Sequence, residues 1–106
     1  MSAPPKIAVV GMAWYRQEDW PALRELFVDA DKLHTKWEDW QRIAVIGEHQ
    51  ARQKGQRVVR VEIRPALFAE WCSILGIPTD AAARARWVKE VTVRQVRQKT
   101  RSPLDV

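Results

Sequence analysis

Residues 56–78 constrain the fold most, because the spacing of their apolar residues changes at Pro65. Apolar and charged residues alternate over 57–64, which is the period-two pattern of a half-buried strand. Pro65 suits the first turn of a helix, since proline has a helical φ and its missing N–H would be unpaired there anyway. Gly76 and Pro78 predict the end of that helix. Its apolar stripe comprises Leu67, Phe68, Trp71, Cys72 and Leu75.

A second strand is predicted near the start of the chain. Residues 6–15 are almost continuously apolar, which is typical of a strand covered on both faces. Gly11 within it indicates a bulge or a close approach of another backbone. The carboxylates of Glu18 and Asp19 then favour a helix that begins at Trp20, because negative charge is stabilising at a helix N-terminus. We expect this helix to end near residues 31–32.

Two further helices are predicted. Thr35 and Glu38 have capping-box spacing and predict a helix that runs to about Lys54 and ends at Gly55. Thr79 or Asp80 caps the last helix. Residues 91–96 are rich in β-branched side chains and are also compatible with a strand, but we favour a helix that continues to about residue 98.

The predicted fold is therefore α+β, a compact single domain of order β-α-α-β-α-α. A small two-stranded sheet is packed by four helices. Residues 1–5 form a flexible arm, 6–98 the domain and 99–106 a frayed basic tail. The length of 106 residues suits one domain with its own core.

Cysteine content and hydropathy indicate a cytoplasmic protein. Cys72 is the single cysteine, so no intramolecular disulfide can form and a reducing compartment is the simplest setting. No apolar run reaches membrane-spanning length, and residues 1–6 lack the layout of a signal peptide. We expect no membrane association.

Six tryptophans are many for a core of this size. A two-stranded sheet is marginal by itself and leaves two open edges. Both observations favour a homodimer, and we expect some tryptophans to lie at its interface. The candidates are Trp14, Trp20, Trp37 and Trp40.

Few residues form a catalytic or metal-binding pattern. Cys72 with His34 or His49 is a conceivable nucleophile and base, but its place on an apolar stripe favours an inert buried thiol. One thiol and two scattered histidines show no metal-ligand spacing, so neither a metal nor a cofactor is expected. The acidic residues lie mostly at helix starts, where capping explains them. Gly11 has no phosphate-binding glycine motif around it.

The charge distribution is the strongest functional signal. Residues 1–50 carry six Lys/Arg and eight Asp/Glu (net −2), whereas residues 51–106 carry twelve and five (net +7). Arg94, Arg97 and Arg101 recur at helical spacing, and Lys99 lies beside them. This pattern matches the footprint of a nucleic-acid phosphate backbone or an acidic protein, although a solvated helix face would have the same composition. The predicted binding residues are Arg84, Arg86, Lys89, Arg94, Arg97 and Arg101. Arg57, Arg60 and Arg64 extend this surface if their side of the strand is open.

The interpretation that we favour is thus a small non-enzymatic binding or accessory protein. The alternative is a small enzyme with a site near residues 14–20, because polar residues just past a strand end often face a crevice. That pocket would use Tyr15, Arg16, Glu18 and His34. Arg16 is equally explained by pairing with a neighbouring carboxylate.

The motifs over residues 12–90 resemble a family of small uncharacterised bacterial proteins. They read W-Y-x-x-E-D-W from Trp14, T-x-W-E-D-W from Thr35, R-V-V-R-V-E-I from Arg57, P-x-x-F-x-x-W-C from Pro65 and G-I-P-x-D-A-A-A-R from Gly76. The resemblance implies a compact bacterial domain. It implies no activity, cofactor or site residue.

Overall fold

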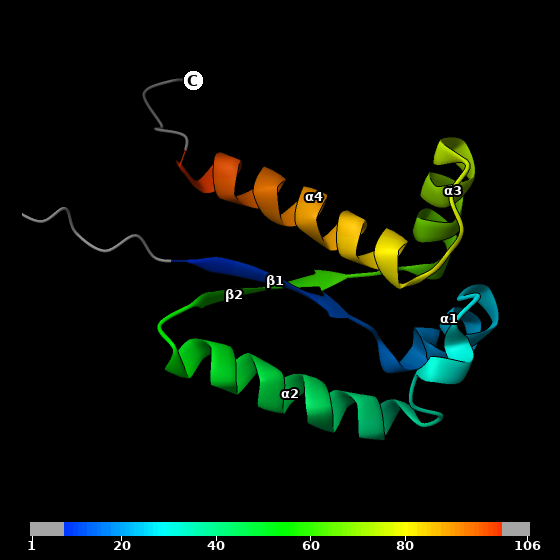
Figure 1. Cartoon of the computed structure of the whole chain (residues 1–106), viewed down its shortest axis with the longest axis horizontal. Coiled ribbons are helices and arrows are strands. Elements are labelled where there is room, and N and C mark those ends of the chain that lie inside the picture. Colours follow the sequence, from blue (N-terminus) through cyan, green and yellow to red (C-terminus); the bar gives the residue numbers. More distant parts are fainter. Residues whose placement is uncertain (1–7, 101–106) are drawn as a thin grey trace, which may run out of the picture.

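The structure is a computed structural model and describes residues 8–100, with side chains for residues 8–98. The predicted α+β fold of order β-α-α-β-α-α is confirmed (Figure 1). The predicted arm at 1–5 and the end of the predicted tail at 101–106 lie outside the described residues. The strands are β1 (Val9–Trp14) and β2 (Arg57–Glu62), the α-helices are α1 (Trp20–Leu26), α2 (Trp37–Gln53), α3 (Pro65–Leu75) and α4 (Ala81–Thr100), and the 3-10 helices are η1 (Gln17–Asp19) and η2 (Ala30–Lys32).

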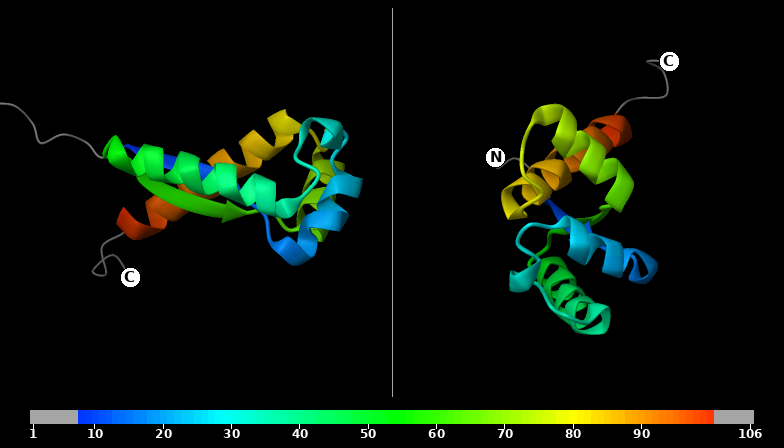
Figure 2. Two further views of the ribbon diagram at one scale, coloured as in Figure 1. Left: turned by 90° about the horizontal axis from the view of Figure 1, so that it is seen from below. Right: turned by 90° about the vertical axis from the view of Figure 1, so that its right-hand side faces the viewer.

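The two strands are parallel, with Val9 opposite Arg57 and Trp14 opposite Glu62. A parallel pair cannot be joined by a tight turn, so the chain crosses back through α1 and α2 before β2 begins. As Figures 1 and 2 show, α2 covers one face of the sheet and α4 covers the other. The prediction that β1 is covered on both faces is therefore confirmed. Because α4 is continuous, the helical prediction for 91–98 is also confirmed.

Gly11 is where β1 meets α4. A Cβ atom at this position would overlap Thr92 Oγ1 and would lie 2.8 Å from Val88 Cγ1. The register from Val9 to Trp14 is unbroken, so Gly11 marks a close approach and not a bulge. On the other face of the sheet, a Cβ at Gly47 of α2 would lie 3.6 Å from Met12 Cε, an ordinary contact distance.

The segment from β2 into α3 follows the sequence pattern. Pro65 is the first residue of α3, and Gly76 ends it in the left-handed conformation with φ 66°. Asp80 caps α4, because its Oδ1 accepts the backbone N–H of Ala83 at 2.9 Å. The predicted apolar stripe of α3 is only partly buried. Phe68 and Cys72 are buried, whereas Leu67 and Leu75 are 58% and 40% exposed.

The first helix is shorter than predicted. α1 ends at Leu26, because tertiary hydrogen bonds take the following residues out of the helix. Phe27 is extended (φ −72°, ψ 122°), and the N–H of Val28 donates to Thr79 O at 3.2 Å. The hydroxyl of Thr79 in turn donates to Leu26 O at 2.6 Å. A short helical turn, η2, replaces the predicted end of the helix.

The predicted capping box was wrong. Lys36 is the N-cap residue of α2 and makes no side-chain capping hydrogen bond. Tertiary contacts hold both residues, and the one at Glu38 uses the carboxylate that the capping box would have needed. The carbonyl oxygen of Thr35 accepts the indole N–H of Trp20 at 3.0 Å, and the carboxylate of Glu38 accepts from Gln17 Nε2 at 3.2 Å.

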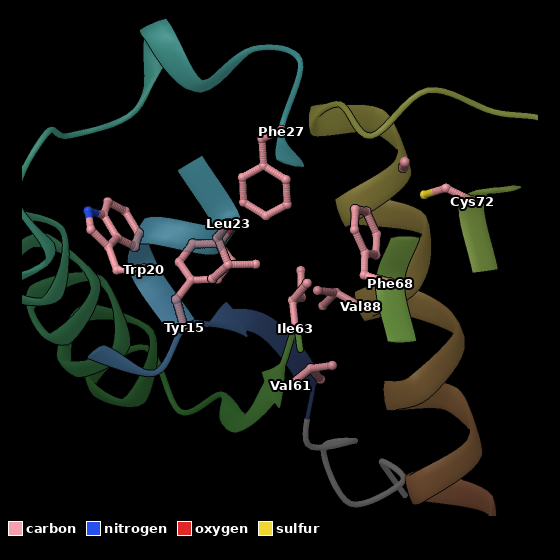
Figure 3. Close-up of a cluster of buried hydrophobic side chains, with 10 residues drawn as sticks. Tyr15, Trp20, Leu23, Phe27, Val61, Ile63, Phe68, Cys72 and Val88 are labelled. Atoms are coloured by element: carbon pink, nitrogen blue, oxygen red, sulfur yellow. The ribbon is translucent and has the colours of Figure 1, made fainter. Parts of the chain in front are cut away.

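The core lies at the end of the sheet where the strands lead into α1 and α3 (Figure 3). Its buried side chains are those of Tyr15, Trp20, Leu23, Phe27, Val61, Ile63, Phe68, Cys72, Ala83 and Val88. Beside it, the ring of Trp40 lies 4.8 Å from that of Tyr15, 5.2 Å from that of Trp14 and 5.9 Å from that of Trp20, centre to centre. Trp14 and Trp20 are 9% and 5% exposed, so their own chain covers them.

Candidate nucleic-acid interface

The outward side of α4 carries most of the basic residues that the sequence indicated. The helix is exposed at these positions because only one side of it packs on β1, through Val88 and Thr92. Four of the predicted residues come together along one shallow, open groove with Glu90 and Val93. The four are Arg86, Lys89, Arg94 and Arg97.

Among the described side chains, the positive charges of Arg86, Lys89 and Arg94 are only weakly compensated. Arg86 lies 3.8 Å from Glu90 and stacks over the ring of Trp71 with 5.6 Å between guanidinium carbon and ring centre. Both side chains of that ion pair are about half exposed, so the pair contributes little to stability. Among the described side chains, neither Lys89 nor Arg94 has a carboxylate within 4.0 Å. The ammonium group of Lys89 and the guanidinium group of Arg94 are therefore open to a ligand.

Arg84 does not belong to this surface. Its side chain is buried, and its guanidinium donates two hydrogen bonds to the carboxylate of Asp29, at 2.8 and 3.1 Å. The guanidinium also stacks over Phe27, 4.4 Å from the ring centre. Hydrogen bonding from Arg84 lowers the pKa of Asp29, which keeps the pair ionised. Arg84 is therefore a structural residue that joins α4 to the loop after α1, and it is unavailable to a ligand.

Sequence reasoning missed this pair, and no local pattern could have revealed it. Asp29 and Arg84 are 55 residues apart. The carboxylate of Asp29 also accepts the N–H of Ala81 at 3.1 Å, at the start of α4. Arg101, the last predicted binding residue, lies outside the described residues.

The arginines of β2, and Arg64 at the start of α3, do not extend the surface of α4 as one patch. Arg60 projects to the other face of the sheet, where it donates to the buried carboxylate of Glu48 at 2.6 and 2.7 Å. It also stacks on the ring of Trp14 at 3.8 Å. Arg64 donates to Asp19 at 2.8 Å. Arg57 is exposed.

The alternative pocket is divided between the interior and the surface. Tyr15 is buried among aromatic rings, and burial raises the pKa of its hydroxyl, an effect that the charge of Arg84 partly offsets. Arg16 lies on the surface and donates to Glu62 at 2.9 Å, with Glu18 at 3.8 Å. His34 is exposed. A buried phenol of raised pKa is a poor proton acceptor near neutral pH, so Tyr15 does not join these surface groups in one polar site.

Cys72 is buried, and burial together with the negative charge of Asp80 raises the pKa of its thiol. A thiol of this kind is a weak nucleophile, because the thiolate is the reactive form. Within the described residues, no group of three or more His, Cys, Asp or Glu side chains is arranged to hold a metal ion. No helix in the described part of the chain combines the length and apolar character needed to cross a membrane.

Comparisons with protein-family models, with curated proteins and with solved structures found no match. The resemblance to a family of small bacterial proteins stays a prediction. The geometry of the basic surface of α4, defined here as Arg86, Lys89, Arg94 and Arg97, is therefore the basis for a function.

Proposed function

We propose that this protein is a non-enzymatic accessory protein that binds the phosphate backbone of nucleic acid through the basic surface of α4. The observation that supports the proposal is the shared groove of four basic side chains, in which Lys89 and Arg94 have no ion-pair partner among the described side chains. Backbone binding needs no base-reading motif, because it is driven by the release of counterions from the nucleic acid.

The salt dependence of the affinity follows from the number of phosphates that the protein contacts. If Lys89 and Arg94 alone each neutralise one phosphate of a DNA duplex, log K falls with log salt at a slope of about −1.8. Affinity then drops about twelvefold between 50 and 200 mM salt. This is a lower limit, since the groove also contains Arg86 and Arg97.

The test is a salt titration of fluorescent duplexes of several unrelated sequences, with fluorescence anisotropy as the readout. We expect similar affinity for every sequence and a slope of −1.8 or steeper. In the variant Lys89→Ala/Arg94→Ala the slope should become shallower by about 1.8, because each lost phosphate contact removes about 0.9 from it. The matched control is Lys36→Ala/Arg42→Ala, which removes two exposed charges from the N-cap and the first turns of α2, on the other face of the sheet. The control should bind as the unaltered protein does.

Two results would overturn the proposal. One is the absence of binding at 50 mM salt. The other is equal weakening by the α4 and α2 variants, which would mean that only total charge matters. If nucleic acid does not bind but an acidic polypeptide such as polyglutamate does, and Lys89→Ala/Arg94→Ala abolishes that binding, the same surface serves an acidic protein.

A further inference from the structure

The outer edge of β1 has unused backbone hydrogen-bonding groups. The N–H of Arg57 donates to Ala8 O at 2.9 Å and that of Ile63 donates to Trp14 O at 3.0 Å, so the even-numbered residues of β1 point toward β2. Successive residues of a strand alternate in direction. The N–H and C=O groups of Val9, Gly11 and Ala13 therefore point away from β2, and within the described residues they have no hydrogen-bond partner.

The two edge strands differ in charged residues, and this difference indicates which edge a partner covers. Proteins protect exposed edge strands with charged residues or proline, because a bare edge invites another strand. β2 reads RVVRVE and has three charged residues, Arg57, Arg60 and Glu62. β1 reads VVGMAW and has neither a charged residue nor a proline. Its edge has the composition of an interior strand.

Apolar side chains flank this bare edge on both layers. Gly47 of α2 faces Met12 on β1, whereas Glu48 faces Arg60 on β2. These two contacts show which side of α2 lies toward β1 and which lies toward β2. Ile43 lies one turn before Gly47 on the β1 side, and it is 56% exposed. On the other layer, an open groove runs between β1 and α4. It is lined by Val9, Gly11, Ala85, Val88, Lys89, Thr92 and Val93. Lys89 and Val93 also line the basic groove of α4, so they lie at the rim between the two grooves.

The shape of the chain indicates that a second copy covers this edge. The sheet is two strands wide and lies between helical layers, so the molecule is a plate of 52 × 32 × 21 Å, and its thin direction runs across the strands (Figure 2). The radius of gyration is 16.1 Å. A compact domain of this length has a value of about 13 Å. The broad face beside β1 is thus left open by residues 8–100.

The spacing of a four-stranded assembly fits helix packing. If β1 pairs with β1 of a second copy, the centres of the two strand pairs lie two strand spacings apart, or about 9.6 Å. Packed helices prefer interaxial distances of about 8–10 Å. Two copies of α4 and two copies of α2 would therefore each pack side by side over the joined sheet.

The area is also adequate. The edge of a six-residue strand is about 20 Å long. Over the 32 Å height of the three layers, this gives about 640 Å² in projection. A stable interface needs about 800 Å² of accessible surface on each partner, and accessible area exceeds the projected area of an uneven surface.

We propose that two copies of this chain join edge to edge through β1, forming one four-stranded sheet of order β2-β1-β1-β2 with a two-fold axis at Gly11. The pairing is antiparallel, because a parallel pair offsets the strands by one residue and cannot obey a two-fold axis. With Gly11 opposite Gly11, Val9 of each copy lies opposite Ala13 of the other. Three N–H donors from each copy then form about six hydrogen bonds across the interface.

The test is solution mass by light scattering over a range of protein concentrations, without nucleic acid, so that its outcome is independent of the proposed function. The chain mass is 12.3 kDa, and we expect twice this value, about 24.6 kDa. Val9→Pro removes an outward N–H and should convert the protein to a monomer, since proline is tolerated in a strand only where no ladder bond is needed. The matched control is Val58→Pro, which removes an outward N–H from the opposite edge of the sheet and should leave the dimer intact.

A second pair of variants avoids any change to the strand. Ile43→Lys places a charge on the β1 side of α2 and should lower the mass to that of a monomer. Val45→Lys places the same charge on the β2 side, at a position that is 43% exposed, and should not. Circular dichroism checks that all four variants are folded. A monomeric unaltered protein at 100 µM would overturn the proposal, as would a dimer that Val58→Pro or Val45→Lys disrupts while Val9→Pro or Ile43→Lys does not.

Discussion

Replacing Gly11 by alanine tests the packing of α4 on the sheet. The new Cβ would overlap Thr92 Oγ1 and lie 2.8 Å from Val88 Cγ1. Thr92 has no room to rotate away freely, because it is buried and its hydroxyl donates to Val88 O at 2.7 Å. Overpacking of this kind costs about 1–3 kcal/mol.

The net effect must include the unfolded chain. Alanine restricts the unfolded state, which stabilises the folded protein by about 0.4–1 kcal/mol where no clash occurs. For Gly11→Ala we expect the clash to dominate, with a loss of about 2 kcal/mol in the free energy of unfolding. Gly47→Ala is the matched control, because its Cβ would meet Met12 at an ordinary 3.6 Å. This second change should stabilise the protein by about 0.5–1 kcal/mol, since glycine is unfavourable within a helix.

The assay is urea unfolding followed by tryptophan fluorescence at one protein concentration for all variants. A double-mutant cycle with Thr92→Ala isolates the clash, because alanine at position 92 removes the overlapping oxygen. We expect the double variant Gly11→Ala/Thr92→Ala to be more stable than the sum of the single effects by about 1 kcal/mol or more. Additive effects, or a Gly11→Ala variant as stable as Gly47→Ala, would refute the close approach of α4 to β1.

Three other predictions concern buried polar groups. Hydrogen bonding from Arg60 lowers the pKa of Glu48 below its ordinary 4.5. The ionised carboxylate therefore stabilises the fold above pH 4.5. This stabilisation is lost as the pH falls through the pKa of Glu48 in the folded protein. Urea titrations should show Glu48→Gln to be less stable by about 2 kcal/mol at pH 7, and this deficit should shrink below pH 4; a deficit constant with pH would contradict the assigned ion pair. Arg84→Ala should lower the free energy of unfolding by about 3 kcal/mol, because it leaves the carboxylate of Asp29 without its partner. The folded Arg84→Ala variant should retain its affinity for DNA in anisotropy measurements, and a loss comparable to that of Lys89→Ala/Arg94→Ala would show that Arg84 reaches the ligand. Cys72 should react with a disulfide reagent at pH 7 far more slowly in the native protein than in guanidinium chloride, and equal rates would show that the thiol is accessible.

Most elements could be predicted because their signals are local. Pro65 and Gly76 bound α3 through their own backbone preferences, and the alternation over 57–64 depends only on the two-residue period of a strand. The missed boundaries have the opposite origin. α1 ends at Leu26 because Thr79, far along the chain, bonds to its last turn. The carboxylate of Glu38 accepts from Gln17 where a capping box was predicted. Local spacing carries no information about such partners.

The candidate site could likewise be predicted where its signal is local, and not where it depends on a distant partner. Helical spacing was sufficient to bring Arg94 and Arg97 onto one side of α4, because both belong to a single element. Spacing also grouped Arg84 with them, whereas the fold directs it inward to Asp29. The side on which a helical residue lies follows from its position in the sequence, but whether that side meets solvent depends on what packs against it.

The sequence alone determined the kinds of elements, their order and the excess of positive charge in the second half of the chain. These properties follow from backbone preferences, periodicity and composition, which act within a few residues. The tertiary structure decided that the strands are parallel, that Gly11 touches Thr92, and that Asp29 neutralises Arg84. It also decided which edge of the sheet lacks protection. Each of these depends on residues far apart in the chain, whose meeting is governed by the packing of the whole core.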